Sequence, residues 1–104
     1  MSGTDIVVAT KRVAAILIRG EEMNLNETVE MMNSDDYRER FKAEYRQLRI
    51  RTIGLKDMLH KYTQNKLSFT PSCSYELLRA QLSSMETYAG ILEERARIEH
   101  IKLY

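Results

Sequence analysis

The 104-residue sequence contains one cysteine, one proline, four glycines and no tryptophan. It therefore has few residues that form disulfides, break helices or favour turns. A lone cysteine, Cys73, cannot form an internal disulfide, and there is no set of thiols to bind a metal. This cysteine usage is typical of a reducing cytoplasm. Alternating β-branched or aromatic runs are also missing, whereas Glu, Arg, Leu, Met and Ala are abundant. The composition therefore predicts an all-α protein.

Neither sign of charge is in large excess, since the sequence has 16 Lys/Arg and 15 Asp/Glu and a formal charge of +1. This balance argues against a strongly basic nucleic-acid binder and against a polybasic membrane anchor. The apolar stretch from Val13 to Ile18 is too short to span a bilayer, so we expect no membrane partner. The basic residues concentrate in residues 35–66, which hold nine Lys/Arg against five Asp/Glu.

Apolar periodicity and capping residues divide the chain into helices. A first short helix is expected from Thr4 or Asp5 to Gly20, and one or two further turns are expected to begin near Asn24 or Asn26. Residues 34–36 supply a cap and acidic first-turn residues for a long helix that runs to about residue 64. Either residues 70–71 or Ser72 and Ser74 open a last helix that runs to about Glu99.

The short connection between the two long helices makes them antiparallel neighbours. We therefore predict a short N-terminal helix followed by a long antiparallel two-helix hairpin, with residues 1–34 as an N-terminal helical extension and residues 35–104 as the hairpin domain. Gly54 and Gly90 fall inside helices, where close helix approach would explain them. Each of two paired helices buries only the face that it turns toward the other. A homo-oligomer is therefore expected to bury the remaining apolar residues. These residues are Ile50, Ile53, Tyr75, Ile91 and Ile98.

No constellation in the sequence is typical of an enzyme. His60 and His100 have no Asp, Glu or His companion at metal-ligand spacing, and no Ser/His/Asp or Cys/His set is evident. There is also no glycine-rich loop that could cradle a phosphate. We expect no catalysis, no metal and no cofactor.

Six polar and aromatic residues on the two long helices could instead bind a small nucleotide. Arginine matches phosphate, tyrosine stacks on bases, and an amide reads the edge of a purine. The alternative is that the tyrosines are core or staple aromatics, the arginines a solvated face, and the glutamine a register-fixing residue in a helical seam. The six candidates are Tyr37, Arg40 and Arg51 on the first long helix and Gln81, Tyr88 and Arg95 on the last.

The stretch from Tyr37 to Leu103 resembles the helical-hairpin domain of phage proteins that sequester immune signalling nucleotides, the anti-CBASS and anti-Thoeris sponges. It is also similar to hairpin proteins of crAss-like phages whose activity the resemblance does not assign. Residues 1–34 are longer than the lead-in of the minimal sponges. The matching pieces are Tyr37-x-x-Arg40, Glu44, Leu48, Arg51 and Leu55, followed by Leu77-Leu78-x-x-Gln81-x-x-x-Met85-x-x-Tyr88-x-x-x-Leu92-x-x-Arg95.

This resemblance implies a non-enzymatic oligomer, favouring a hexamer, in the cytoplasm of an infected bacterial cell. Its ligands would be cyclic dinucleotides, cyclic trinucleotides or cyclic ADP-ribose, which it would sequester without cleavage. By position, Tyr37 would stack on a base and Arg51 would contact a phosphate. Two other functions stay open on the sequence: an adaptor hairpin that binds a protein partner, and a DNA-binding unit, against which the small net charge argues.

Overall fold

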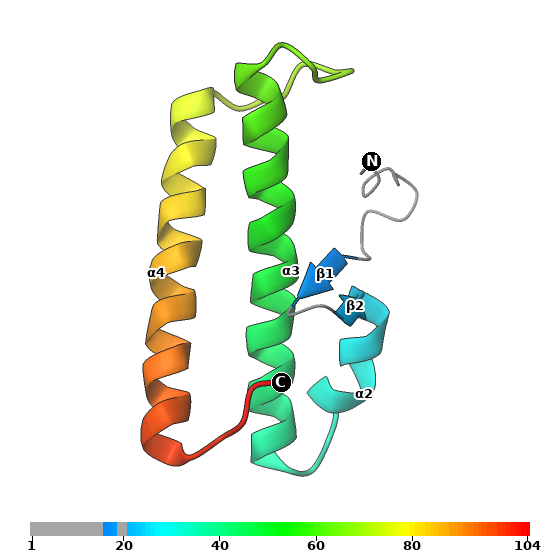
Figure 1. Cartoon of the computed structure of the whole chain (residues 1–104), viewed down its shortest axis with the longest axis vertical. Coiled ribbons are helices and arrows are strands. Elements are labelled where there is room, and N and C mark those ends of the chain that lie inside the picture. The colour runs from blue at the N-terminus through cyan, green and yellow to red at the C-terminus, as the bar shows by residue number, and fades with distance from the viewer. Residues whose placement is uncertain (1–15, 19–20) are drawn as a thin grey trace.

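The computed structural model describes residues 16–18 and 21–104, and two long helices dominate it. Figure 1 shows α3 and α4 side by side along the long axis, with the short N-terminal elements gathered beside α3. The chain order is β1 (Ile16–Ile18), β2 (Glu21–Met23), a 3₁₀ helix η2 (Leu25–Thr28), α2 (Val29–Met32), α3 (Tyr37–Thr63) and α4 (Tyr75–Glu99). The helical fold class predicted from composition is confirmed for the main body of the described chain.

Helix α3 begins and ends where its capping residues predict. The Asp36 side chain accepts a hydrogen bond from the backbone N–H of Arg38 at 2.9 Å, which satisfies one of the free donors of the first turn. The helix ends at Thr63, and Asn65 follows with φ of 58°. Asparagine tolerates this left-handed conformation better than most residues. The predicted end near residue 64 is therefore correct.

Helix α4 is capped by Ser74, one of the two predicted starts, whose hydroxyl accepts from the Leu77 N–H at 3.1 Å. Its last turn closes at His100, which has φ of 58° and reverses the chain. The Arg38 guanidinium donates to the carbonyl oxygen of His100 at 3.1 Å. This hydrogen bond ties the start of α3 to the end of α4, so the two helices run in opposite directions.

The main core lies between α3 and α4 and is closed by the C-terminal residues 101–104, which cross back over α3 (Figure 1). Leu82 and Leu92 are each 1% exposed, and burying a leucine stabilises a fold by about 1.5–3 kcal/mol. Alanines on α4 occupy little volume, so the helices can approach closely there. The core residues are Phe41, Tyr45, Leu48, Ala89, Leu92, Ala96 and Ile101.

The predicted turns near Asn24 are present as η2 and α2. Asn24 caps η2 in a capping box with Glu27. The buried Thr28 hydroxyl accepts from Gln47 Nε2 at 2.8 Å, which attaches this segment to α3. Leu25 packs against Ile50, so part of the apolar surface of α3 is covered within the chain.

The predicted N-terminal helix is wrong over its last turn. Ile16–Ile18 forms β1 and pairs antiparallel with β2, with Ile18 opposite Glu21. Two β-branched residues in three favour extended backbone, and so short an apolar run has no period that separates helix from strand. The rest of the predicted helix, residues 4–15 and 19–20, lies outside the described residues.

Close helix approach does not explain the two helical glycines. A Cβ atom added at Gly54 or at Gly90 would meet nothing within 4 Å. Both positions are therefore open in the single chain, and the interpretation drawn from the sequence is wrong for them.

Candidate ligand-binding site

Two of the six candidates, Tyr37 and Arg95, meet where α3 begins and α4 ends. Arg95 Nη2 donates to Tyr37 Oη at 2.8 Å, and the Tyr37 hydroxyl donates to Glu99 Oε1 at 2.9 Å. Arg95 Nε lies 3.6 Å from Glu99 Oε2, and its guanidinium carbon lies 4.9 Å from the centre of the Phe41 ring. Tyr37 is 45% exposed. A solvent-accessible aromatic ring thus stands beside a cation that contacts both a carboxylate and a second ring.

A second contact of the same kind joins the middle of the two helices. The Tyr88 hydroxyl donates to Glu44 Oε2, and Tyr88 is 42% exposed. This hydrogen bond, reinforced by burial, raises the pKa of Tyr88, so the phenol stays neutral and remains a donor. For Arg95, desolvation opposes the charge, but Tyr37 and Glu99 outweigh it and raise the pKa.

The spacing of these contacts places the remaining pair of candidates. From Tyr37 to Glu44 on α3, and from Arg95 back to Tyr88 on α4, the step is seven residues, which returns to the same side of a helix. One further step of seven residues reaches Arg51 on α3 and Gln81 on α4, which no hydrogen bond or ion pair joins in the part of the chain that the structure describes. We call this side of the hairpin the polar flank; it consists of Tyr37, Glu44, Arg51, Gln81, Tyr88 and Arg95.

Arg51 and Gln81 differ in the hydrogen bonds that their side chains form. Arg51 is exposed and forms no hydrogen bond or ion pair in the part of the chain that the structure describes. Gln81 donates to Met85 Sδ at 3.7 Å, which is a weak contact. Among the described residues, the flank therefore has one cation without a partner and one amide with a weak one.

Arg40 does not join the polar flank through any hydrogen bond or ion pair with the described residues. Its Nη1 donates to the Ser34 carbonyl oxygen at 2.8 Å, which holds the segment before α3 against the first turns of that helix. The role that this contact indicates is to position the connection from α2 to α3.

Tyr37 and Tyr88 are too exposed to be core aromatics. Their hydrogen bonds between α3 and α4 are compatible with a staple as well as with a ligand contact. Sequence reasoning missed two carboxylates, Glu44 and Glu99, as parts of this arrangement. The signals for them were present, since Glu99 follows Arg95 by four residues and Glu44 follows Tyr37 by seven.

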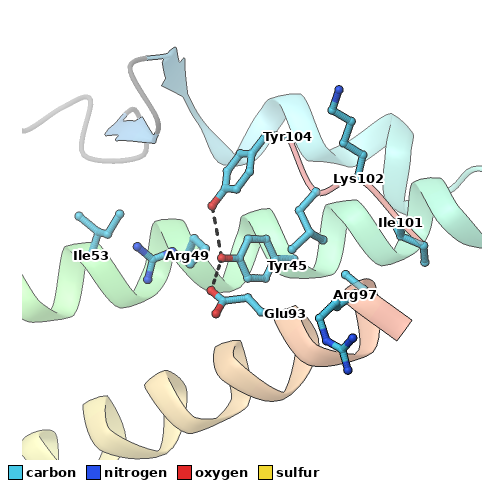
Figure 2. Close-up of a pocket in the computed structure, with 10 residues that line it drawn as sticks. Tyr45, Arg49, Ile53, Glu93, Arg97, Ile101, Lys102 and Tyr104 are labelled. Atoms are coloured by element: carbon cyan, nitrogen blue, oxygen red, sulfur yellow. Dashed lines mark hydrogen bonds between the residues drawn. The ribbon is translucent and has the colours of Figure 1, made fainter. Parts of the chain in front are cut away.

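A pocket of about 640 Å³ lies on the other side of the hairpin and was not predicted at all (Figure 2). Tyr104 donates to Tyr45 Oη at 3.3 Å, and Tyr45 donates to Glu93 Oε2 at 2.5 Å. Burial, followed by these hydrogen bonds, raises the pKa of Tyr45 far above its ordinary value. The C-terminal residues complete this pocket, and no motif in the sequence predicts their position.

Two classes of site find no support in the residues described. Residues 16–18 and 21–104 contain no group of three or more His, Cys, Asp or Glu side chains placed to hold a metal ion. No helix within the same ranges is long and apolar enough to cross a membrane.

The family model described as Sequestin matches residues 35–98, which include all of α3 and nearly all of α4. The chain belongs to the Sequestin family. This agrees with the resemblance to nucleotide sponges, and it indicates a sequestering, non-catalytic protein that binds small signalling molecules. No curated protein and no solved structure matches the chain. The Sequestin match leaves out residues 1–34, whose status as a separate extension stays a prediction.

Proposed function

We propose that this Sequestin protein binds cyclic dinucleotides, cyclic trinucleotides or cyclic ADP-ribose and sequesters them without cleavage. In this proposal it is a phage anti-defence protein of the anti-CBASS or anti-Thoeris type, acting in the cytoplasm of the infected bacterium. The observation that carries the proposal is the polar flank of a family member. It consists of two exposed tyrosines and an arginine that no described residue pairs with, aligned along one side of α3 and α4.

Each type of side chain on the flank has a chemical counterpart in such a ligand. The Tyr37 ring offers a stacking surface for a base, and stacking on an aromatic contributes about 1–3 kcal/mol per base. Arg51 offers its guanidinium to a phosphate, because no described residue occupies it. Gln81 and Tyr88 supply hydrogen-bonding groups between these two. Arg95 is a further phosphate contact, which would require it to release Glu99.

Sequestration needs tight binding, because a sponge lowers the free messenger only when its sites rival the ligand in number. A nanomolar dissociation constant corresponds to about −12 kcal/mol. One exposed flank is unlike the enclosed pockets that reach such affinities. The proposal therefore includes a homo-oligomer, with a hexamer favoured, in which neighbouring subunits enclose the flank.

An exposed apolar stripe on α4 supports this assembly. Leu77, Ile91 and Ile98 are 59%, 55% and 60% exposed and, together with Ser84, repeat every seven residues. With Gln81, Tyr88 and Arg95 between them, they form the alternating three- and four-residue spacing of a helix–helix seam. A second helix packed on this stripe would bury the apolar residues and would cover the α4 part of the polar flank at the same time.

The same stripe also favours the second candidate function, an adaptor that binds a protein partner. Here a helix of another protein would take the place of the second copy, and no nucleotide would bind. The two functions differ in one cheap observation, because only the sponge gains thermal stability from cyclic nucleotides at micromolar concentration.

Calorimetry of the purified chain against a panel of cyclic dinucleotides, cyclic trinucleotides and cyclic ADP-ribose isomers tests the proposal. We expect tight binding to at least one compound, and recovery of that compound intact after heating. Tyr37→Ala and Arg51→Ala should each abolish binding with the molar mass of the oligomer unchanged. Arg79→Ala is the matched control, since Arg79 is exposed on α4 away from the flank. Unchanged affinity in both flank variants would refute the assignment.

A further inference from the structure

The pocket on the opposite side of the hairpin is built within one chain from three segments. Tyr45 and Arg49 come from α3, Glu93 and Arg97 from α4, and Lys102 and Tyr104 from the C-terminal residues (Figure 2). Apolar side chains that include Ile53 and Ile101 complete its wall. Its volume of about 640 Å³ falls within the range of ordinary small-molecule sites.

Arg49 carries the argument, because its Nε atom is buried and has no hydrogen-bond partner among the residues that the structure describes. A buried donor on a charged group that lacks an acceptor costs stability, so native structures rarely retain one without a reason. Figure 2 shows the Arg49 side chain at the pocket, near Tyr45. An acceptor in the pocket would supply the missing hydrogen bond once the Arg49 side chain turns toward it, because the Nε atom is closed to solvent in this structure.

The charges around Arg49 select an anionic acceptor. The lining contains three cationic side chains, those of Arg49, Arg97 and Lys102, and one acidic side chain, that of Glu93. That carboxylate already accepts the Tyr45 hydroxyl at 2.5 Å. Arg97 is paired with Glu94 at the surface, which leaves Arg49 and Lys102 as the cations not paired with an acid in the described chain.

We propose that this pocket is a second ligand site, which binds a small organic phosphate within a single subunit. The phosphate oxygens accept from Arg49 and Lys102, a pairing for which the guanidinium fork is well suited. The organic part of the ligand packs on the Tyr104 ring and on Ile53. This site does not rest on the proposed function, because it shares no residue with the polar flank.

Arginine side-chain NMR tests the proposal directly, since it observes the Nε–H group of Arg49 in the full chain. The probes are adenosine monophosphate, ribose 5-phosphate, inorganic phosphate and adenosine. We expect the two organic phosphates to shift the Arg49 Nε–H resonance and to saturate it, and adenosine to leave it unchanged. A response to adenosine as strong as that to adenosine monophosphate would overturn the assignment to a phosphate. Saturation by inorganic phosphate at the same concentration would overturn the role of the organic part.

Substitutions then assign the binding to this pocket. Arg49→Gln should weaken adenosine monophosphate binding at least tenfold, and Arg49→Lys should restore part of it. The matched control Arg79→Gln removes an exposed arginine of α4 that does not line the pocket, and it should bind like the parent chain. Equal affinity in Arg49→Gln and the parent would refute the site, as would loss of adenosine monophosphate binding in Tyr37→Ala with Arg49→Gln unaffected.

The two proposals fail in different ways. Cyclic-nucleotide binding that survives Arg49→Gln leaves the polar flank as its site, whatever happens to adenosine monophosphate. Conversely, adenosine monophosphate can bind at Arg49 in a chain that takes no cyclic nucleotide.

Discussion

The hydroxyl of Tyr37 and the guanidinium of Arg95 are 58 residues apart in the sequence and 2.8 Å apart in the structure. Seven residues later on α3 and seven residues earlier on α4, the Tyr88 hydroxyl donates to the Glu44 carboxylate. The ligand proposed for the polar flank would lie along these two contacts.

Tyr37→Phe and Tyr37→Ala should separate stacking from hydrogen bonding in messenger binding. The hydroxyl is already engaged by Arg95 and Glu99, so Tyr37→Phe should keep affinity within about threefold, because the stacking ring remains. Tyr37→Ala removes the ring and should cost at least about tenfold, in line with stacking energies. Calorimetry measures both. Equal losses in the two variants would contradict a stacking role.

Leu82→Ala should destabilise the hairpin by about 2–5 kcal/mol, because it leaves a cavity in the seam between α3 and α4. Leu82 is 1% exposed. Phe69→Ala is the control, since Phe69 is 56% exposed in the connection and its loss should stay within about 0.5 kcal/mol. Urea denaturation at one fixed protein concentration gives both values. A similar loss in both variants would place Phe69 in a contact that the single chain does not contain.

Stability should fall in alkaline solution because of Tyr45. Its pKa is raised in the folded chain, mainly by burial and then by the bond to Glu93, above the value of about 10 that a tyrosine has in an unfolded chain. A raised folded pKa means that the contribution of Tyr45 is complete below about pH 10 and is lost as pH rises through the folded pKa. Denaturation between pH 9 and 11 should show a shallower pH dependence in Tyr45→Phe than in the parent. Identical slopes would exclude Tyr45 as the cause.

Gly90→Ala should stabilise the isolated chain by about 0.5–1 kcal/mol, because alanine restricts the unfolded state and favours the helix. An added Cβ meets no atom within 4 Å, so no clash offsets this gain. Thermal denaturation together with light scattering checks the prediction. A rise in stability of the single chain accompanied by a smaller oligomer would locate Gly90 at a subunit contact.

Local chemistry was enough to place the long helices. Asp36 and Ser74 are capping residues followed by helix-forming sequence, so the starts of α3 and α4 follow from interactions within one turn. The same local information failed at Ile16–Ile18, because three apolar residues are compatible with a helix or a strand until a pairing partner decides. In this protein the pairing partner is β2.

The spacing of Tyr37 and Arg51 by fourteen residues, and of Gln81, Tyr88 and Arg95 by seven, is readable in the sequence because each set lies on one helix. The sequence does not show which residue of α3 faces which residue of α4, since this depends on the length and path of the connection between the helices.

The pocket at Arg49 could not be predicted from the sequence, because it depends on contacts between segments that are far apart in the chain. The left-handed His100 turns the chain back over α3 and brings Tyr104 to Tyr45, a contact between segments with no shared local pattern. The residues of each helix face are therefore a property of the sequence, because helical geometry is local. Their partners across the hairpin, and the pocket that Arg49 lines together with the C-terminal residues, follow only from long-range packing.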